Sequence, residues 1–459
     1  MLKTIASLSA VRIVIGLTQV ISPLIVVRLL SQEEFGIYQG FVAITSVLIV
    51  LASSGFDASV VYFLPNAARR EKLLLWDTTR AVLIISLGVS LVFLALASLG
   101  VFGANNLLFF LQCAAYVLLF ANLNWVENFL LVKNRIKELA VYAMARLASR
   151  ILVVLAAALV FRDANAVIWA SLGIELLRIA AVIVWISTRS IISFEQSTIF
   201  PAKQARYAIP IGLTGICQAI SQHAGKIVVL AVSGPAILAL YAVGSYLQVL
   251  IRTVKAGIQE AVFPELVKTA SDMRRMLVLH RQSTVLQFIA FVLPLVLLSF
   301  RAEDYVTLVF PAEYIAAVPV LQIFMFLLLR RAFNFDSLFR ASGISGFALS
   351  GSVAGLVVNG MTTLLLWPYI GWHSAAVGYV ASEFFVEAVY FQKARMVTGA
   401  SFEDLVDRVE LAKSTAAALV AAVVLVVSEA LFPPNAIRLV IEAVAYLVSA
   451  TVLMMALNV

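Results

Sequence analysis

The feature that most constrains this chain is a run of about 20 apolar residues that recurs from one end of the sequence to the other. As an α-helix, a run of that length crosses the roughly 30 Å hydrocarbon core of a bilayer. Backbone amides inside a bilayer must bond within their own segment, so such runs fold as helices. Only 13% of the residues are charged, against about 25% in soluble domains. The chain is therefore predicted to be an all-α polytopic membrane protein.

The apolar runs predict fourteen spans, and the polar stretches between them are too short for a soluble domain. The spans lie near residues 8–30, 37–63, 79–100, 107–132, 139–160, 165–187, 207–232, 237–265, 282–300, 314–335, 346–370, 373–392, 412–431 and 436–457. The longest connections divide the chain into an N-terminal lobe (1–190), a C-terminal lobe (206–395) and an additional helix pair (411–459).

The two lobes also share a short sequence pattern. GLTQVIS at 16–22 in the first span matches GICQAIS at 215–221 in the seventh, and each is followed by a short outer turn and a tyrosine that opens the next helix. Two six-helix repeats around a central cavity are the plan of many transporters.

The net charge of +8 reflects topology rather than a nucleic-acid partner. With the N-terminus in the cytoplasm, 24 of the 33 Lys and Arg residues fall on cytoplasmic segments or the adjoining helix ends, and four fall outside. This asymmetry follows the positive-inside rule and places both termini in the cytoplasm. Cys113 and Cys217 lie in spans, and no metal-ligand spacing, nucleophile motif or phosphate-binding loop occurs. We expect no catalytic residue, metal or cofactor, and no enzyme.

Five cations remain, and all lie within spans: Arg12, Arg178, Lys226, Arg252 and Lys255. A charge at the bilayer centre costs at least about 2.5 to 3.5 kcal/mol, so each needs a cavity or a polar partner. In the eighth span, steps of three or four residues place Tyr241, Gln248, Arg252 and Lys255 on one face. In the seventh span, Gln218, Gln222 and Lys226 form a similar row, with His223 beside it. The competing interpretation is pairing with acids such as Glu260, or hydrogen bonding between helices.

Other polar residues in the spans divide into two groups. Arg12 and Gln19 share a face of the first span, although Arg12 is close enough to the cytoplasmic end to snorkel. Glu175 and Arg178 are expected to form a static pair. Candidates for ion coupling, or alternatively for structural roles, are Asp57, Glu127, Glu383 and Glu387.

Because phosphate groups accept several charge-assisted hydrogen bonds, a cavity with several cations favours a phosphorylated ligand.

Three segments resemble a known family: RLLSQEEFGIYQ at 28–39, VFPAEYIAAVPVLQI at 309–323 and RASGISG at 340–346. They are similar to Wzx-type polysaccharide flippases of the MOP superfamily, which includes lipid II flippases and MATE exporters, and the resemblance covers essentially the whole chain. Many relatives carry an acid in the seventh span near position 225, where this chain has Gly225, so the resemblance implies no ion-coupling residue at that position. The resemblance implies a flippase that moves an oligosaccharide on polyprenyl pyrophosphate across the bacterial inner membrane by alternating access, for O-antigen, capsule or exopolysaccharide export.

The resemblance also implies roles for the polar residues. Arg12 joins Lys226, Arg252 and Lys255 around the pyrophosphate, while Gln19, Gln218, Gln222, His223, Gln248 and Tyr241 meet sugar hydroxyls or water. The last two spans would form a groove for the lipid tail, or alternatively a packing or dimer face. We expect a monomer surrounded by membrane lipids, with polymerase or export components as candidate partners. A MATE-like exporter and a membrane-embedded glycosyltransferase or polymerase are the alternatives.

Overall fold

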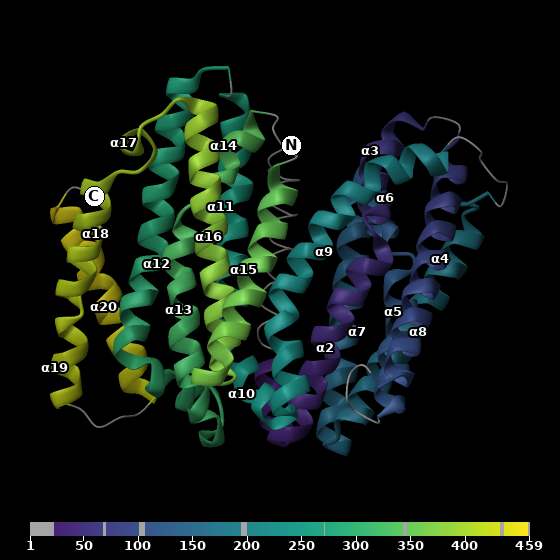
Figure 1. The fold of residues 1–459 in the computed structure, drawn as a ribbon, viewed down its shortest axis with the longest axis horizontal. Coiled ribbons are helices and arrows are strands. Elements are labelled where there is room, and N and C mark those ends of the chain that lie inside the picture. Colours follow the sequence, from purple (N-terminus) through teal and green to yellow (C-terminus); the bar gives the residue numbers. More distant parts are fainter. Residues whose placement is uncertain are drawn as a thin grey trace. The chain divides into compact units, whose positions relative to one another are not determined.

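The computed structural model describes residues 23–67, 70–100, 106–193, 200–269, 271–342, 347–431 and 436–457. Within these ranges every regular element is a helix, which confirms the predicted all-α membrane fold (Figure 1). The chain separates into two compact units, Met1–Ala239 and Leu240–Val459. This division falls inside helix α10, and the three-part division at 190–206 and 395–411 stays a prediction.

The first unit is built from the helices before the division and the start of α10. They are α2 (Gln32–Ser53), α3 (Phe56–Phe63), α4 (Glu71–Ser98), α5 (Leu107–Ala121), α6 (Trp125–Val132), α7 (Ile136–Phe161), α8 (Ala164–Thr188), α9 (Phe200–Ser233) and α10 (Pro235–Ser245).

The second unit holds the remaining helices, and α18 and α20 pack against α12 (Figure 1). They are α11 (Leu247–Lys268), α12 (Met273–Val309), α13 (Val318–Ala332), α14 (Asp336–Ala341), α15 (Phe347–Ile370), α16 (His373–Thr398), α17 (Phe402–Leu405), α18 (Arg408–Ala421), α19 (Val423–Leu431) and α20 (Ala436–Ala456).

Twelve segments of the described chain are long and apolar enough to cross a membrane. One of them, Leu349–Thr398, contains two helices, α15 and α16, so it corresponds to two predicted spans. Every predicted span from the second onward thus has a counterpart. The first, near 8–30, lies outside the described residues up to residue 22, so the count of fourteen stays a prediction.

Two spans that the sequence predicts as continuous are broken by residues in the left-handed backbone region. The second span breaks at Ser54 and Gly55, which have φ angles of 43° and 79°. A side chain on Gly55 would be strained by this φ and would place its Cβ 2.4 Å from the carbonyl oxygen of Ala208. The fourth span breaks between α5 and α6, where Leu123 has φ of 63°. In the eighth and thirteenth spans, Tyr246 and Ala422 separate successive helices but keep helical φ and ψ angles. Apolar periodicity does not reveal these breaks, because the residues on both sides are equally apolar.

Small residues bring α2 into close contact with α9 and with the start of α10. A Cβ added to Gly36 would lie 1.8 Å from the carbonyl oxygen of Pro235, the first residue of α10, and one on Gly212 of α9 would lie 2.4 Å from the backbone of Ser54, at the end of α2. Such close backbone approach is typical of membrane helices, whose association rests on packing rather than on the hydrophobic effect. It explains why the seventh predicted span belongs to the first compact unit.

Candidate functional site

The largest group of charged side chains in the second unit lies where α11, α13 and α16 meet. Arg330, on the last turn of α13, is 7% exposed and binds two acids of α16. Its guanidinium lies 3.0 Å from the carboxylate of Glu383 and 2.9 Å from that of Glu387. Arg331 is 3.1 Å from Glu383. Both acids, predicted as ion-coupling candidates, are therefore held by arginines, and a coupling role stays a prediction.

The predicted cations of the eighth span belong to the same group. Lys255 donates from Nζ to the carbonyl oxygen of Phe333 at 3.2 Å, just beyond the end of α13. Arg252 is within electrostatic reach of Tyr379, Arg331 and Glu383. We call Arg252, Lys255, Arg330, Arg331, Glu383 and Glu387 the α11–α13–α16 charge cluster.

The cluster holds four cationic side chains and two carboxylates. Glu383 and Glu387 are bound by Arg330 and Arg331, and the nearby Asp336 pairs with Arg340 at 3.1 Å. Several guanidinium and ammonium groups gathered away from bulk water favour an anionic ligand, because an anion accepts charge-assisted hydrogen bonds from them. The cluster is therefore a candidate anion site.

The first unit holds a second polar group, made of two arginines and three acids. Arg146 lies 2.9 Å from Glu127, and Arg178 lies 2.5 Å from Glu175, which confirms the expected static pair. Asp57 is within electrostatic reach of Arg146, Arg178 and Glu127, and its Oδ1 has no hydrogen-bond partner in the described part of the chain. Asp57 and Glu127 therefore lie close to each other, as candidates whose coupling role stays a prediction.

Arg178 also stabilises the break in the fourth span. Its Nη2 donates to the carbonyl oxygens of Leu119, Phe120 and Asn122, at 2.7, 3.2 and 3.1 Å. These carbonyls lie at the end of α5, where the helix supplies no partners and a bilayer supplies no water. Arg178 therefore serves the fold of the first unit.

The predicted row on α9 is partly accessible. Gln218 is exposed, whereas Gln222, His223 and Lys226 are half-buried. Lys226 donates from Nζ to Oε1 of the buried Gln39 on α2 at 3.4 Å. Lys226 is thus held against α2 within the first unit.

The other predicted contacts are scattered. Tyr241 is buried and packs edge-on against Phe324, with ring centroids 5.8 Å apart. Gln248 is half-buried in the first turn of α11. Arg12 and Gln19 lie outside the described residues. The sugar-binding roles of these residues stay predictions.

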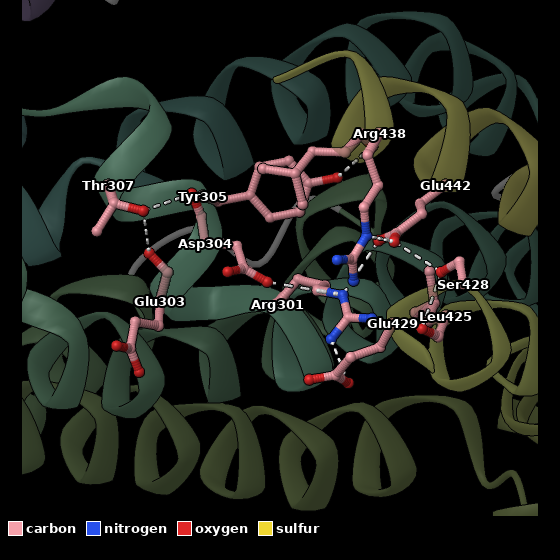
Figure 2. A network of polar contacts seen from close by, with 11 residues as sticks. Arg301, Glu303, Asp304, Tyr305, Thr307, Leu425, Ser428, Glu429, Arg438 and Glu442 are labelled. Carbon is pink, nitrogen blue, oxygen red and sulfur yellow. Dashed lines mark hydrogen bonds and ion pairs between the residues drawn. The ribbon is translucent and has the colours of Figure 1, made fainter. Parts of the chain in front are cut away.

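The additional helix pair is joined to α12 by a buried polar network (Figure 2). Arg301, at a kink in α12, lies 2.8 Å from Glu429 of α19 and 3.1 Å from Glu442 of α20. Ser428 and Arg438 bond the same Glu442 carboxylate. These bonds fix the pair to the second unit, and a groove for a lipid tail stays a prediction.

Arg330 and Arg331 were missed as site residues, because at the end of an apolar run they follow the positive-inside pattern. A usable signal was present: Glu383 and Glu387, four residues apart in one span, require counter-ions. Arg146 was missed for the same reason, since it lies near the predicted cytoplasmic end of the fifth span.

The comparisons with known proteins agree with this fold. The model of a family described as polysaccharide biosynthesis protein matches residues 25–319. No curated protein sequence matches the chain.

Several solved structures are similar. The lipid II flippase MurJ, in an inward-closed conformation, is 11% identical with a TM-score of 0.70, over 97% of this chain and 100% of that one. A single-residue mutant of the Vibrio cholerae MATE transporter VcmN is 15% identical with a TM-score of 0.57, over 88% and 97%. A Pyrococcus furiosus MOP superfamily transporter, described as having a binding pocket of reverse polarity, is 16% identical with a TM-score of 0.52, over 87% and 96%.

Proposed function

The chain belongs to the family of polysaccharide biosynthesis proteins and has the fold of MOP superfamily transporters, and from this premise we propose that it flips a lipid-linked oligosaccharide. The cargo is carried on polyprenyl pyrophosphate and moves from the inner to the outer leaflet of a bacterial inner membrane. The protein acts as a monomer with both termini in the cytoplasm, and its two six-helix lobes alternately open to either side.

The observation that carries the proposal is the gathering of four cationic side chains, Arg252, Lys255, Arg330 and Arg331, in the α11–α13–α16 charge cluster. Pyrophosphate carries several negative charges and accepts many charge-assisted hydrogen bonds, and guanidinium groups match its geometry. Arg252 and Lys255 bind it from α11, Lys226 from α9 and Arg12 from the first span. A cluster with more cations than acids among its members disfavours a MATE-like exporter of cationic substrates, whose cavity would be expected to be acidic.

Transport by purified protein in liposomes tests the proposal. Labelled polyprenyl-pyrophosphate oligosaccharide is incorporated into both leaflets, and the label accessible from outside is followed over time. Arg252→Gln and Lys226→Gln each remove one charge–pyrophosphate contact and are expected to slow flipping by about tenfold or more, since a hydrogen bond to a charged group contributes about 1.5 to 3 kcal/mol.

The matched control is Lys268→Gln, on the same helix as Arg252. Lys268 is exposed at the end of α11 and pairs with Glu265 at 2.6 Å, so its loss should leave the flipping rate unchanged. Comparable slowing in all three variants would show a nonspecific charge effect. Normal rates in both Arg252→Gln and Lys226→Gln would exclude the proposed binding role.

A further inference from the structure

A cavity opens inside the first unit where α7 separates from α8. The buried residues of α7 all lie in its last third, at Val154, Ala157 and Ala158. Along its first two thirds α7 has half-buried and exposed residues but no fully buried one, and a cavity of about 690 Å³ lies between α6, α7 and α8. This volume is within the range of small-molecule sites, about 300 to 1,000 Å³.

The middle of the cavity is apolar and reaches the surface of the unit. Its walls are two stripes at helical spacing, one on α7 and one on α8. Two of the lining residues, Val141 and Leu177, are 70% and 65% exposed, so the cavity has an open side. The helices that form this side are apolar membrane spans, so the opening would meet lipid acyl chains.

One end of the cavity carries surplus positive charge. Lys137 and Arg189 are in the lining, and Arg135 lies over the Trp185 ring at 6.0 Å. Glu138 is the acid there, and Arg135 holds it with two hydrogen bonds of 2.6 Å. The contact between Arg189 and Glu138 is longer, at 3.6 Å, and both side chains are half-exposed. A more highly charged anion could therefore replace Glu138 as the partner of Arg189 at little cost.

The inner end of the cavity is polar but already compensated. Arg146 and Arg178 line it, and each is bound to its own acid, at 2.9 and 2.5 Å. A second anion there would compete with those carboxylates. The charges therefore orient an amphipathic guest, with its anionic group at the Lys137 end and its apolar part between the helices.

We propose that this cavity binds a membrane phospholipid with an anionic headgroup. One acyl chain fills the apolar middle, and the phosphate lies between Lys137 and Arg189. Trp185 lies at the level of the headgroup, where tryptophan is favoured because its ring is apolar and its N–H is polar. The positive-inside pattern predicts this end to be cytoplasmic, and anionic lipids of that leaflet attract such basic groups. The inference does not depend on the identity of the transported cargo.

Quenching of Trp185 fluorescence tests the site in the full-length protein. The protein is reconstituted in phosphatidylcholine vesicles with increasing fractions of phosphatidylglycerol brominated on its acyl chains. The Trp185 signal is the difference between the native chain, with six tryptophans, and Trp185→Phe. We expect saturable quenching by brominated phosphatidylglycerol, and only proportional quenching by brominated phosphatidylcholine.

Two variants and two matched controls identify the site. Lys137→Gln with Arg189→Gln should weaken phosphatidylglycerol binding by about tenfold or more. Ala181→Phe, which fills the cavity, should abolish the saturable part. Leu176→Phe, on an exposed position of α8 outside the lining, and Arg162→Gln, beyond the far end of α7, should leave it unchanged.

Three results would overturn the proposal. Equal, unsaturable quenching by both lipids would mean ordinary contact with the surrounding bilayer. Unchanged binding in the Lys137 and Arg189 double variant would remove the role of charge. Displacement of phosphatidylglycerol by a small fraction of polyprenyl phosphate would assign the cavity to the cargo instead. Native mass spectrometry of the protein, which needs no tryptophan, provides the check where Trp185→Phe fails to fold.

Discussion

Replacing Arg330 with alanine should destabilise the protein much more than the same change at Arg331. Arg330 binds Glu383 at 3.0 Å and Glu387 at 2.9 Å, and both Arg330 and Glu387 are buried. Its loss removes the ion pair of Glu387, and breaking a buried pair from one side costs about 3 to 5 kcal/mol. Arg331 binds Glu383 at 3.1 Å, and that acid would keep Arg330. Loss of Arg331 should therefore cost on the order of 1 kcal/mol.

Equilibrium unfolding in mixed detergent micelles measures this difference. A gap of about 2 kcal/mol or more corresponds to over about 25-fold in the unfolding equilibrium constant. Adding Glu387→Gln to Arg330→Ala removes the carboxylate left without its ion pair and should recover part of the loss. Equal destabilisation by the two arginine variants, or no recovery in the double variant, would refute the argument from buried pairing.

Three further predictions concern the fold around the sites. Arg178→Met leaves three backbone carbonyls and a buried carboxylate without their partner, and should lower the free energy of unfolding by about 3 kcal/mol or more in the same assay. Gly36→Ala places a Cβ 1.8 Å from a backbone oxygen of the first residue of α10 and should cost about 1 to 3 kcal/mol, whereas Gly88→Ala, with open space around it, should cost nothing. Hydrogen bonds from the side chain and backbone of Ser401 lower the pKa of Asp404, so the stability that they contribute is complete above the usual carboxyl pKa and is lost as the pH falls through the lowered pKa. The protection of the α17 amides against hydrogen exchange, taken relative to the intrinsic exchange rate at each pH, should therefore decrease only at acid pH.

The face of the eighth span could be predicted from the sequence because helical spacing is a local property. Of the residues predicted to share this face, Tyr241 is buried, and Gln248, Arg252 and Lys255 are half-buried, while Thr253 and Ala256 are exposed. The residues that share a stripe follow from 3.6 residues per turn. The partners of these residues cannot be predicted in this way, because Glu383 is over a hundred residues away in the sequence and only the packing of α16 against α13 brings it close.

The breaks in the second and fourth spans could not be predicted from the apolar pattern. Leu123 adopts φ of 63° between two asparagines, and its neighbours read as an uninterrupted membrane helix. The break is tolerated because Arg178 supplies donors from α8, and Asn122 bonds Ser86 of α4 at 3.1 Å. These are tertiary contacts, so a sequence window around the break does not contain the residues that permit it.

Lys255 is a residue at which a structural role in hydrogen bonding the backbone can be distinguished from a role in binding a ligand. Its Nζ donates to the carbonyl of Phe333, which lies just after α13, as Arg178 does for α5. Unlike Arg178, it has no carboxylate within ion-pair distance among the described side chains. A glutamine side-chain amide could donate the same hydrogen bond to the carbonyl of Phe333 without the cost of a buried charge. The backbone hydrogen bond therefore does not explain why this residue is a lysine. Lys255→Gln should therefore fold at least as stably as the native chain and lose flipping, while Lys255→Arg should retain it. A Lys255→Gln variant that flips at the native rate would show that the charge has no part in holding the cargo.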